Sequence, residues 1–501
     1  VGNMADFVRE FGVQHQIKLE QNYRSYSNIL DSANALIGNN KNRLGKNLRT
    51  DQGAGEPVRV YESTSDFAEA QWLVDEVRQL VKGDGLTRKE VAVLYRSNAQ
   101  SRVMETALFN AGVPYKVYGG LRFFERAEIK HALAYLRILE NANDDTSFMR
   151  IVNFPPRGIG SRSVEQLQDA AKSLGCSLHD AVSTTAGKAG AKLAGFVAMI
   201  DVMREQTPGM TLREIIELVL DKTGLIEHYK TEKEGADRVE NLEELVNAAE
   251  SFVTQEGFGR DAEATASEMA PNAEDGEVMS PLAAFLTHAA LEAGDNQAQA
   301  GEDAIQLMTV HASKGLEFDA VFISGLEEGL FPHENSMNDF DGLEEERRLM
   351  YVAITRARKR LYLSHSQTRM LHGQTRYNLK SRFLDELPEE CLKWITPKNP
   401  GFATGLGGGW TSPAQAFQAK PAWGHSSLSS AETYKSPPVP VQKAEPSHGI
   451  KVAMKVFHTK FGEGQVLAVE GAGADARAQV NFPRHGVKWL ALSVAKLTPV
   501  E

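Results

Sequence analysis

The chain has 501 residues, of which 42% are hydrophobic and 24% charged, a composition typical of a globular protein with about two to four domains. It contains no run of 18 apolar residues, which excludes a membrane-spanning helix, and residues 1–6 lack the basic and apolar segments of a signal peptide. The net charge of −11 by itself argues weakly against a nucleic-acid partner.

Two cysteines, Cys176 and Cys391, lie far apart in the sequence. We therefore expect no disulfide framework, no cysteine-based metal site and a reducing, cytoplasmic location.

The charge is segregated along the chain. Residues 347–382 hold ten Lys or Arg and no acidic residue, whereas residues 241–280 hold ten Asp or Glu and one Arg. Local patches rather than the total charge attract a phosphate backbone, so a nucleic-acid partner stays possible. Two solvated faces are the alternative explanation.

The first 120 residues alternate strand and helix patterns. A continuous apolar run predicts a buried strand at Val91–Tyr95, and shorter strands are predicted at Val58–Tyr61 and Tyr115–Tyr118. Helical spacing of apolar residues predicts a helix at Asp66–Leu80, and a second helix is predicted at Ala99–Asn110. Strand, helix and strand at this spacing predict a parallel sheet.

From Phe124 to about Leu291 strand patterns are absent and helical patterns dominate. The predicted helices are Ala127–Leu139, Ser163–Ser173, Leu212–Lys222, Val239–Phe252 and Pro281–Glu292. Residues 254–280 are acidic and small, which is typical of a loose loop.

The alternation returns at Ile305. Strands are predicted at Ile305–Val310, Ala320–Ser324 and Leu361–Ser364, with a helix at Leu343–Ile354. The simplest interpretation is one α/β domain interrupted by an all-helical insertion.

The last hundred residues change character twice. Residues 397–446 carry eight of the 19 prolines and a glycine-rich run at 405–409, which is a linker composition. Residues 451–501 consist of short strand patterns broken by glycine turns, which predicts a small β-barrel.

Three strings carry the chemistry. In residues 19–25, just before a helix, Arg24 can clamp a phosphate and Tyr23 can stack on a base, although a surface Arg–Tyr pair is the plainer explanation. In residues 307–318, an apolar strand runs into a glycine-containing turn, and ligands of α/β sheets bind at such strand ends. In residues 344–358, Arg356 ends an amphipathic helix, where an ordinary helix-end cation is the alternative.

In this order and spacing the three strings resemble the fourth, fifth and sixth motifs of the UvrD/Rep/PcrA group of superfamily 1 DNA helicases. The resemblance covers roughly residues 19–390 and resumes at 451–501, where the tail is similar to a Tudor-like domain. Further matching segments fill the gaps: Leu94–Arg102, Tyr118–Arg126, Arg157–Gly160 and Glu327–His333.

The resemblance implies an ATP site between two RecA-like domains. Tyr23 would stack on the adenine, and Arg24 would reach the γ-phosphate, together with Arg356 as the arginine finger. Glu317 would hydrogen-bond the ribose, and Gly315 would let the backbone pass close to the nucleotide. Arg24 and Arg356 are thus the candidate catalytic residues, and ATP with Mg²⁺ is the implied cofactor.

The sequence has no G-x-x-x-x-G-K-[ST] loop to hold the β- and γ-phosphates and no Asp-Glu pair after a buried strand to hold Mg²⁺. We therefore assign no metal ligand in this chain. We expect that it lacks the first RecA-like domain, of which residues 1–18 would be the last remnant.

The resemblance also implies contacts to single-stranded DNA. The candidates are Arg96, Asn98, Thr309, His311 and His333.

Gly158 and Gly160 open a helix and could place backbone N–H groups against duplex phosphate. Phe123 and Phe124 we interpret as hydrophobic core rather than as base-stacking residues. His131 departs from the family, in which an Asp is expected at this position.

The expected fold class is α/β: a second RecA-like parallel-sheet domain split by an all-helical insertion, followed by a small Tudor-like β-barrel. The expected ranges are a remnant at 1–18, the RecA-like domain at 19–120 and 304–390, the insertion at 121–303, a disordered linker at 391–450 and the barrel at 451–501.

The function implied is that of the C-terminal portion of an ATP-dependent 3′→5′ DNA helicase of nucleotide excision and mismatch repair, with this chain alone inactive. The implied partners are single-stranded DNA, single/double-strand junctions, the missing RecA-like domain and, through the barrel, RNA polymerase and repair proteins. A non-enzymatic DNA- and protein-binding module is the alternative. A helicase-like nuclease subunit is disfavoured, because no cluster of Asp, Glu and Lys follows Arg382.

Overall fold

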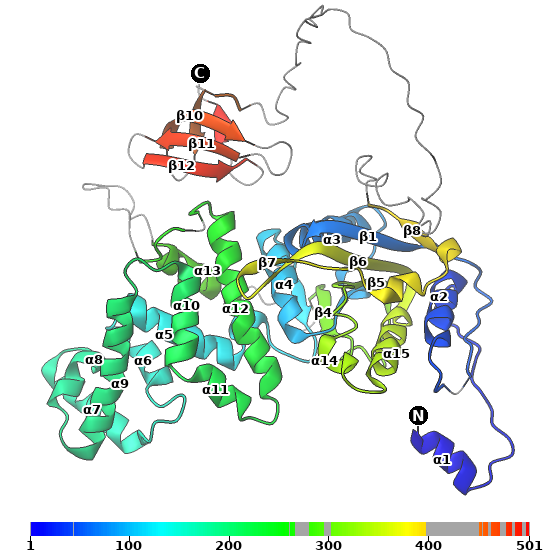
Figure 1. Cartoon of the computed structure of the whole chain (residues 1–501), viewed down its shortest axis with the longest axis horizontal. Helices are drawn as coiled ribbons and strands as arrows, with labels where there is room; N and C mark the ends of the chain where they lie inside the picture. The colour runs from blue at the N-terminus through cyan, green and yellow to red at the C-terminus, as the bar shows by residue number, and fades with distance from the viewer. Residues whose placement is uncertain are drawn as a thin grey trace, which may run out of the picture. The chain divides into compact units, whose positions relative to one another are not determined.

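The computed structural model describes residues 2–43, 45–259, 261–265, 280–294, 302–396, 450–452, 454–458, 462–470, 477–482, 486–492 and 497–499. The chain divides into two compact units, Val1–Thr396 and Pro397–Glu501, and each is described by itself (Figure 1). The predicted linker falls largely on residues 397–449, which lie outside the described residues.

An eight-stranded sheet organises the first unit. Its order is β3-β4-β2-β5-β6-β1-β8, and all six of these pairings are parallel, as the sequence predicts, while β7 pairs with β6 in antiparallel fashion. The strands are β1 Val58–Ser65, β2 Val91–Tyr95, β3 Tyr115–Val117, β4 Ile305–Thr309, β5 Phe318–Ile323, β6 Ala357–Leu371, β7 Gln374–Tyr377 and β8 Leu392–Trp394.

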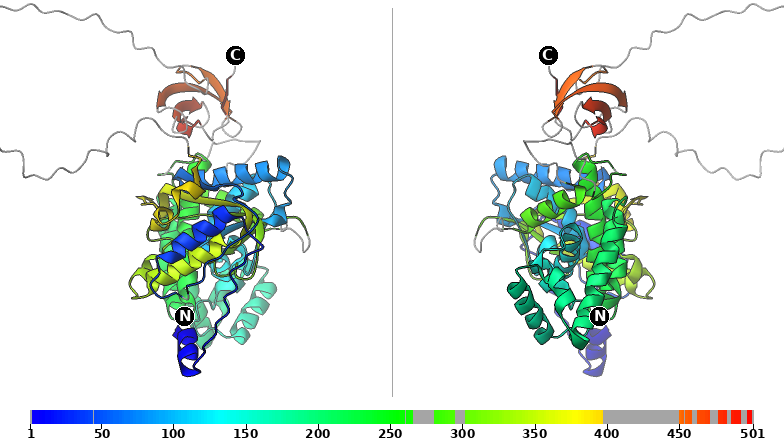
Figure 2. Two further views of the ribbon diagram at one scale, coloured as in Figure 1. Left: turned by 90° about the vertical axis from the view of Figure 1, so that its right-hand side faces the viewer. Right: turned by 90° about the vertical axis from the view of Figure 1, so that its left-hand side faces the viewer.

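Helices cover both faces of this sheet, which explains why every residue of β2 and β5 is buried. One face packs against α3 (Asp66–Lys82) and α4 (Ser101–Asn110). The other packs against α2 (Ser27–Gly38) and α15 (Gly342–Ile354), which run side by side in Figure 2. The remaining elements around the sheet are α1 Gly2–Glu10, η1 Arg88–Glu90, η2 Asn98–Gln100, α14 Glu334–Met337, α16 Arg382–Asp385 and η5 Glu389–Cys391.

The sheet extends past residue 390, the predicted end of the α/β domain. Val58 to Val60 of β1 pair in parallel with Leu392 to Trp394 of β8. Three residues are too short for periodicity to reveal, so pairing with β1 rather than local pattern defines this strand.

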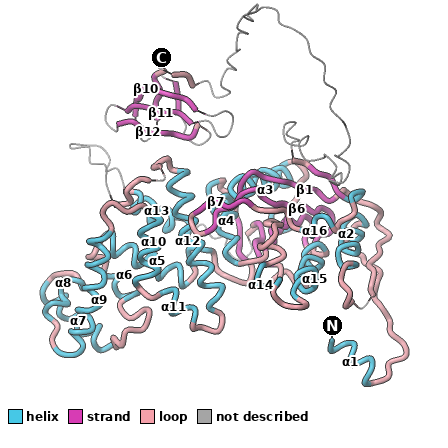
Figure 3. The backbone as a smooth tube through the Cα atoms, in the orientation of Figure 1, coloured by secondary structure: helices cyan, strands magenta, loops and turns pink. Residues whose placement is uncertain are grey.

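Between β3 and β4, all the regular elements of the described residues are helices, as expected (Figure 3). They enclose one core of their own. The bounds are η3 Phe123–Glu125, α5 Ala127–Glu140, α6 Asp145–Ile151, α7 Ser161–Leu174, α8 Leu178–Ala181, η4 Val182–Thr184, α9 Gly187–Gln206, α10 Leu212–Lys222, α11 Leu225–Lys230, α12 Gly235–Gln255 and α13 Pro281–Ala293.

Side-chain caps fix where several of these helices begin. The Thr211 hydroxyl accepts from the Glu214 backbone N–H, and the Glu214 carboxylate accepts from that of Thr211, so α10 starts with a capping box. Ser280 caps α13, whose first residue is Pro281, a residue suited to that position.

The second unit is a five-stranded antiparallel sheet in the order β12-β11-β10-β9-β13. Its buried residues include Val456, Val480 and Phe482. The strands are β9 Lys455–His458, β10 Gly462–Glu470, β11 Arg477–Phe482, β12 Gly486–Ala491 and β13 Leu497–Pro499. None of the helices within the described residues is long and apolar enough to cross a membrane.

A buried ionic cluster joins β6 to the loop after β5. Arg369 donates to Glu69 at 2.7 Å and to both oxygens of Glu327 at 2.9 and 2.7 Å, and all three side chains are buried. Glu327 also accepts from Ser366 and Asn378. Burial alone would raise the pKa of Glu327, but Arg369 and these donors hold it below its usual range.

We predict that Arg369→Ala destabilises the first unit by about 3–5 kcal/mol, because two buried carboxylates lose their shared cation. Urea unfolding followed by circular dichroism measures the loss. The control is Arg376→Ala, at the exposed position directly opposite Arg369 in the β6–β7 register, which should shift stability by less than about 0.5 kcal/mol. Equal effects of the two substitutions would contradict the assignment.

Candidate functional site

Polar side chains gather at the carboxyl edge of the parallel sheet. Adjacent strands β4, β2 and β5 end at Thr309, Tyr95 and Ile323, and the segments that follow carry His311, Arg96 and the loop 324–333. Parallel strands end at the same edge, so segments far apart in sequence meet there.

Glu346 of α15 holds two of these segments in place, those that carry Arg96 and His333. Its carboxylate, on a residue only 1% exposed, accepts from Arg96 Nε at 3.0 Å and Nη2 at 2.8 Å. It also accepts from the backbone N–H of His333 at 3.0 Å and from the Ser336 hydroxyl at 2.9 Å. Burial would raise the pKa of Glu346, but these donors lower it, so the carboxylate stays ionised.

The two histidines of the edge are held neutral. Burial, followed by the charge of Arg96, lowers the pKa of both His333 and His311, with Lys314 adding to the effect on His311. The His333 ring accepts from the N–H of Asn335 and so caps α14. At neutral pH these rings can therefore offer hydrogen bonds rather than charge.

Asn98 and Thr309 lie on the same edge of the sheet, and their side chains make longer hydrogen bonds than Arg96 does. The Asn98 amide is 3.5 Å from a carboxylate oxygen of Asp237 on α12. The Thr309 hydroxyl accepts from the N–H of Ala312 at 3.3 Å. Arg96, Asn98, Thr309, His311 and His333 are thus all found at the carboxyl edge of three neighbouring strands.

A second cluster forms where the segment before α2 meets the C-terminal end of α15. Arg24 pairs through Nε with Glu317 and donates from Nη1 to the Thr355 carbonyl at 3.1 Å. Arg358 donates to the other oxygen of Glu317 at 2.6 Å. Hydrogen bonds from Arg24 and then Arg358 hold the pKa of Glu317 below its usual range.

Arg356 lies two residues past Ile354, the last residue of α15. Its guanidinium donates to the carbonyls of Val352 and Leu316 and to the Thr355 hydroxyl, and within the described residues it makes no ion pair. Burial, followed by repulsion from Arg24, lowers the pKa of Arg356.

Tyr23 and Gly315 complete this cluster. The Tyr23 side chain is 82% exposed. Gly315 has a φ of +83°, and a side chain there would meet no atom within 4 Å, so the need for glycine is conformational.

This cluster is suited to bind a ligand that has an anionic group next to a planar ring. Four cations, Arg24, Arg356, Arg358 and Lys359, lie near only two carboxylates, Glu317 and Asp319. This leaves excess positive charge beside the exposed ring of Tyr23. An anion between Arg24 and Arg356 would relieve their mutual repulsion. The donor set therefore fits the phosphate end of a nucleotide, with Tyr23 available to its base.

Gly158 and Gly160 lie apart from both clusters, before α7 in the helical region (Figure 1). Gly158 has a φ of +72°, and its carbonyl accepts from Lys192 at 2.8 Å. The neighbouring Arg157 turns inward, donating to the Tyr135 hydroxyl and to three backbone carbonyls.

Phe123 and Phe124 are buried, which confirms that they belong to the hydrophobic core. His131 stacks on Phe154 with ring centroids 3.7 Å apart, and burial, followed by Arg150, lowers its pKa to about 4. The ring that replaces the expected Asp is therefore neutral and packed.

Most of the positive charges of the basic segment 347–382 are neutralised by carboxylates outside the segment. Eight of its ten Lys and Arg residues pair with carboxylates in other parts of the first unit. The exceptions among the described residues are Arg356 and Arg376. Most of the basic charge of this segment is therefore used in ion pairs within the first unit.

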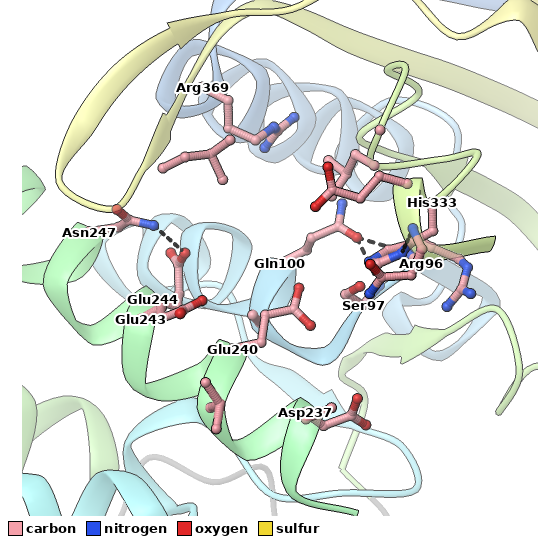
Figure 4. Close-up of a pocket in the computed structure, with 18 of the residues that line it drawn as sticks. Arg96, Ser97, Gln100, Asp237, Glu240, Glu243, Glu244, Asn247, His333 and Arg369 are labelled. Atoms are coloured by element: carbon pink, nitrogen blue, oxygen red, sulfur yellow. Dashed lines mark hydrogen bonds between the residues drawn. The ribbon is translucent and has the colours of Figure 1, made fainter. Parts of the chain in front are cut away.

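A cavity of about 820 Å³ lies between α12 and the α/β domain. As Figure 4 shows, Asp237, Glu240, Glu243 and Glu244 line its α12 wall. Burial and then Asp237 raise the pKa of Glu240 to about 7, since four carboxylates crowd this helix face. Arg96, His333 and Arg369 line other parts of the same cavity, so acidic and basic side chains share its surface. Within the described residues, no group of three or more His, Cys, Asp or Glu is arranged to hold a metal ion.

Sequence reasoning missed Glu346. It is an acidic residue at helical spacing from the buried Met350 and Ala353, and a carboxylate on an apolar stripe signals a buried partner. Its partners, Arg96 and His333, lie in distant segments, and nothing local identifies them.

Two family models match the chain. Residues 17–368 match the UvrD-like helicase C-terminal domain, and residues 452–501 match the PcrA/UvrD tudor domain.

Similar proteins include DNA helicase II of Escherichia coli, which is 42% identical over 508 residues, covering 100% of this chain and 64% of that protein. ATP-dependent DNA helicase UvrD1 of Mycobacterium tuberculosis is 39% identical, covering 97% of this chain and 61% of that protein. ATP-dependent DNA helicase PcrA of Bacillus subtilis is 37% identical, covering 100% and 64%.

The chain thus spans less than two thirds of the length of these relatives. The first family model alone covers well over half of the chain, and the second accounts for its C-terminal sheet. The chain belongs to the UvrD-like family of DNA helicases.

Proposed function

We propose that residues 1–501 are the part of an ATP-dependent 3′→5′ DNA helicase that grips single-stranded DNA and contributes one side of the ATP site. The whole protein would translocate on single-stranded DNA and unwind duplex during nucleotide excision and mismatch repair. The relatives' names, DNA helicase II and ATP-dependent DNA helicase, support this reading.

The observation that carries the proposal is the position of α15. Near its start Glu346 holds Arg96 and His333, and at its end Arg356 joins Arg24 and Glu317. Glu346 lies eight positions before Ile354, the last residue of α15, which corresponds to roughly 12 Å of helix. One rigid element therefore touches both clusters, so a displacement at one is felt at the other.

At the nucleotide, the residues of this chain act on charge and orientation. Bound ATP with Mg²⁺ supplies the free energy of hydrolysis. Arg24 and Arg356 neutralise negative charge on the γ-phosphate as it develops, Tyr23 stacks on the adenine, Glu317 binds the ribose and Gly315 allows close backbone approach. The Mg²⁺ ligands belong to the first RecA-like domain.

At the DNA, Arg96 and Asn98 bind phosphate or sugar of the single strand. Thr309, His311 and His333 add neutral hydrogen bonds along the same edge. Gly158 and Gly160 present the start of α7 to duplex phosphate at a single/double-strand junction.

The domain assignment follows from these roles. The α/β domain is the second RecA-like domain, the helices 121–303 are an insertion that contacts duplex, and residues 1–18 end the first RecA-like domain. The tudor domain would contact proteins, with RNA polymerase and repair proteins as the candidates.

The second candidate is a DNA- and protein-binding module without enzymatic activity. The absence of a phosphate-binding loop and an Asp-Glu pair from the 501 residues favours it for this chain taken alone.

We predict that purified residues 1–501 bind fluorescent oligothymidylate but show no DNA-stimulated ATP hydrolysis. Fluorescence anisotropy and a coupled ATPase assay measure the two activities. Failure to bind the oligonucleotide at low salt would overturn the proposal. Robust turnover that Arg356→Ala abolishes would instead show that the chain contains a complete ATPase site.

We further predict that Arg96→Ala weakens the binding of oligothymidylate. The slope of log affinity against log salt should fall by about 0.7, because one phosphate contact to a single strand is lost. Lys82→Ala, at an exposed cation on the opposite face of the sheet, is the matched control and should leave the slope unchanged. An unchanged slope for Arg96→Ala would remove Arg96 from the site.

A further inference from the structure

We infer that Lys116 and Tyr118, at the edge strand β3, extend the single-strand site by one strand: Tyr118 stacks on a base and Lys116 binds a neighbouring phosphate. The inference rests on the proposed function and adds residues to it.

The register aligns β3 with the proposed contacts. Val117 pairs with Leu307 of β4, and the backbone N–H of Tyr118 donates to the Leu307 carbonyl at 2.8 Å, which continues the ladder. Thr309 of β4 in turn pairs with Tyr95 of β2. The segments after β3, β4 and β2 therefore form a row in which neighbouring strands are about 4.8 Å apart.

Side-chain alternation directs Lys116 to the face of the sheet that carries Arg96. Tyr115 and Val117 pack into the core under α3 and α4, as Val93 and Tyr95 do. Lys116 therefore points to the opposite face, the face to which Leu94 and Met308 contribute, and Tyr118 follows two residues later. Arg96 likewise follows Leu94 by two residues, and it reaches Glu346 on this face.

The end of β3 is exposed where a nucleic acid can reach it. Tyr118 is 43% exposed, Leu121 is 55% exposed, and Lys116 is exposed between two buried neighbours. Gly119, with a φ of +75°, lies against the turn that carries His311: a Cβ added there would sit 3.6 Å from the Cβ of Ala312. The segment that carries Tyr118 thus adjoins the turn that carries His311, a proposed DNA contact.

A buried arginine ties this segment to the Asn98 loop. Arg126 donates from Nε to the Leu121 carbonyl at 3.2 Å and from Nη1 to the Asn98 carbonyl at 3.2 Å. It also donates to Ser101 and Asn241. The two loops are therefore held in one arrangement before any ligand binds, which limits the entropy lost on binding.

An exposed lysine on an edge strand also protects a sheet from aggregation, and that is the competing explanation for Lys116. It gives no reason for an exposed tyrosine beside it. A cation next to an aromatic ring on a charged edge is the combination that binds single strands without sequence preference.

The test compares oligothymidylate with an oligonucleotide of equal length that carries abasic sites. Tyr118→Ala should weaken binding to oligothymidylate roughly tenfold and leave binding to the abasic strand unchanged, because only a base can stack. Tyr118→Phe should retain wild-type binding. Lys116→Ala should weaken binding to both strands and lower the salt slope.

Phe67→Ala is the matched control, since Phe67 lies on α3 and is 39% exposed; this substitution should change neither affinity. Wild-type affinity of Tyr118→Ala for oligothymidylate would overturn the inference while leaving the proposed function intact. Equal losses on both strands would also overturn it, since they would assign Tyr118 a structural role. Absence of binding by the unsubstituted chain would instead defeat the proposed function.

Discussion

The buried carboxylate of Glu346 is the group on which the candidate DNA site depends. It accepts hydrogen bonds from Arg96, from the backbone of His333 and from Ser336, and so holds two loops and a short helix against α15. Burying a lone carboxylate is costly, and these donors offset that cost only while they keep this arrangement. The same contact partly neutralises Arg96. A phosphate at Arg96 therefore competes with Glu346, which in the proposed function favours DNA binding of moderate strength that can be released.

Helix α15 connects the candidate DNA site to the arginine cluster at its C-terminal end. Arg347, next to Glu346, is held by Glu386 at 2.7 Å and by Asn40 at 2.6 Å, so the helix is anchored on both sides. Its far end carries Arg356, whose repulsion from Arg24 an anion would relieve. In the proposed function, a nucleotide that draws these arginines together acts on a rigid helix whose other end positions Arg96 and His333. No flexible relay between the two sites is required.

The sequence predicted the parts of the fold that local pattern encodes. A continuous apolar run revealed β2, and family motifs brought together the residues of both clusters. Helix α9 was not predicted, since Gly187, Gly190 and Gly195 disfavour a helix, and burial of residues such as Leu193 and Phe196 stabilises it instead. The pairings of Glu346 with Arg96 and of Arg369 with Glu69 could not be predicted from the sequence either. Each joins residues 250 or more positions apart, and only the folded sheet brings them together.

The most direct measurement is amide hydrogen–deuterium exchange of residues 1–501 with and without oligothymidylate. A single-strand site at the carboxyl edge of the sheet requires protection in the segments after β2, β4 and β3 and in the loop that ends at His333. Little change is expected in α8 and α9. Protection confined to the tudor domain or to the helical region, with the sheet edge unchanged, would contradict this site.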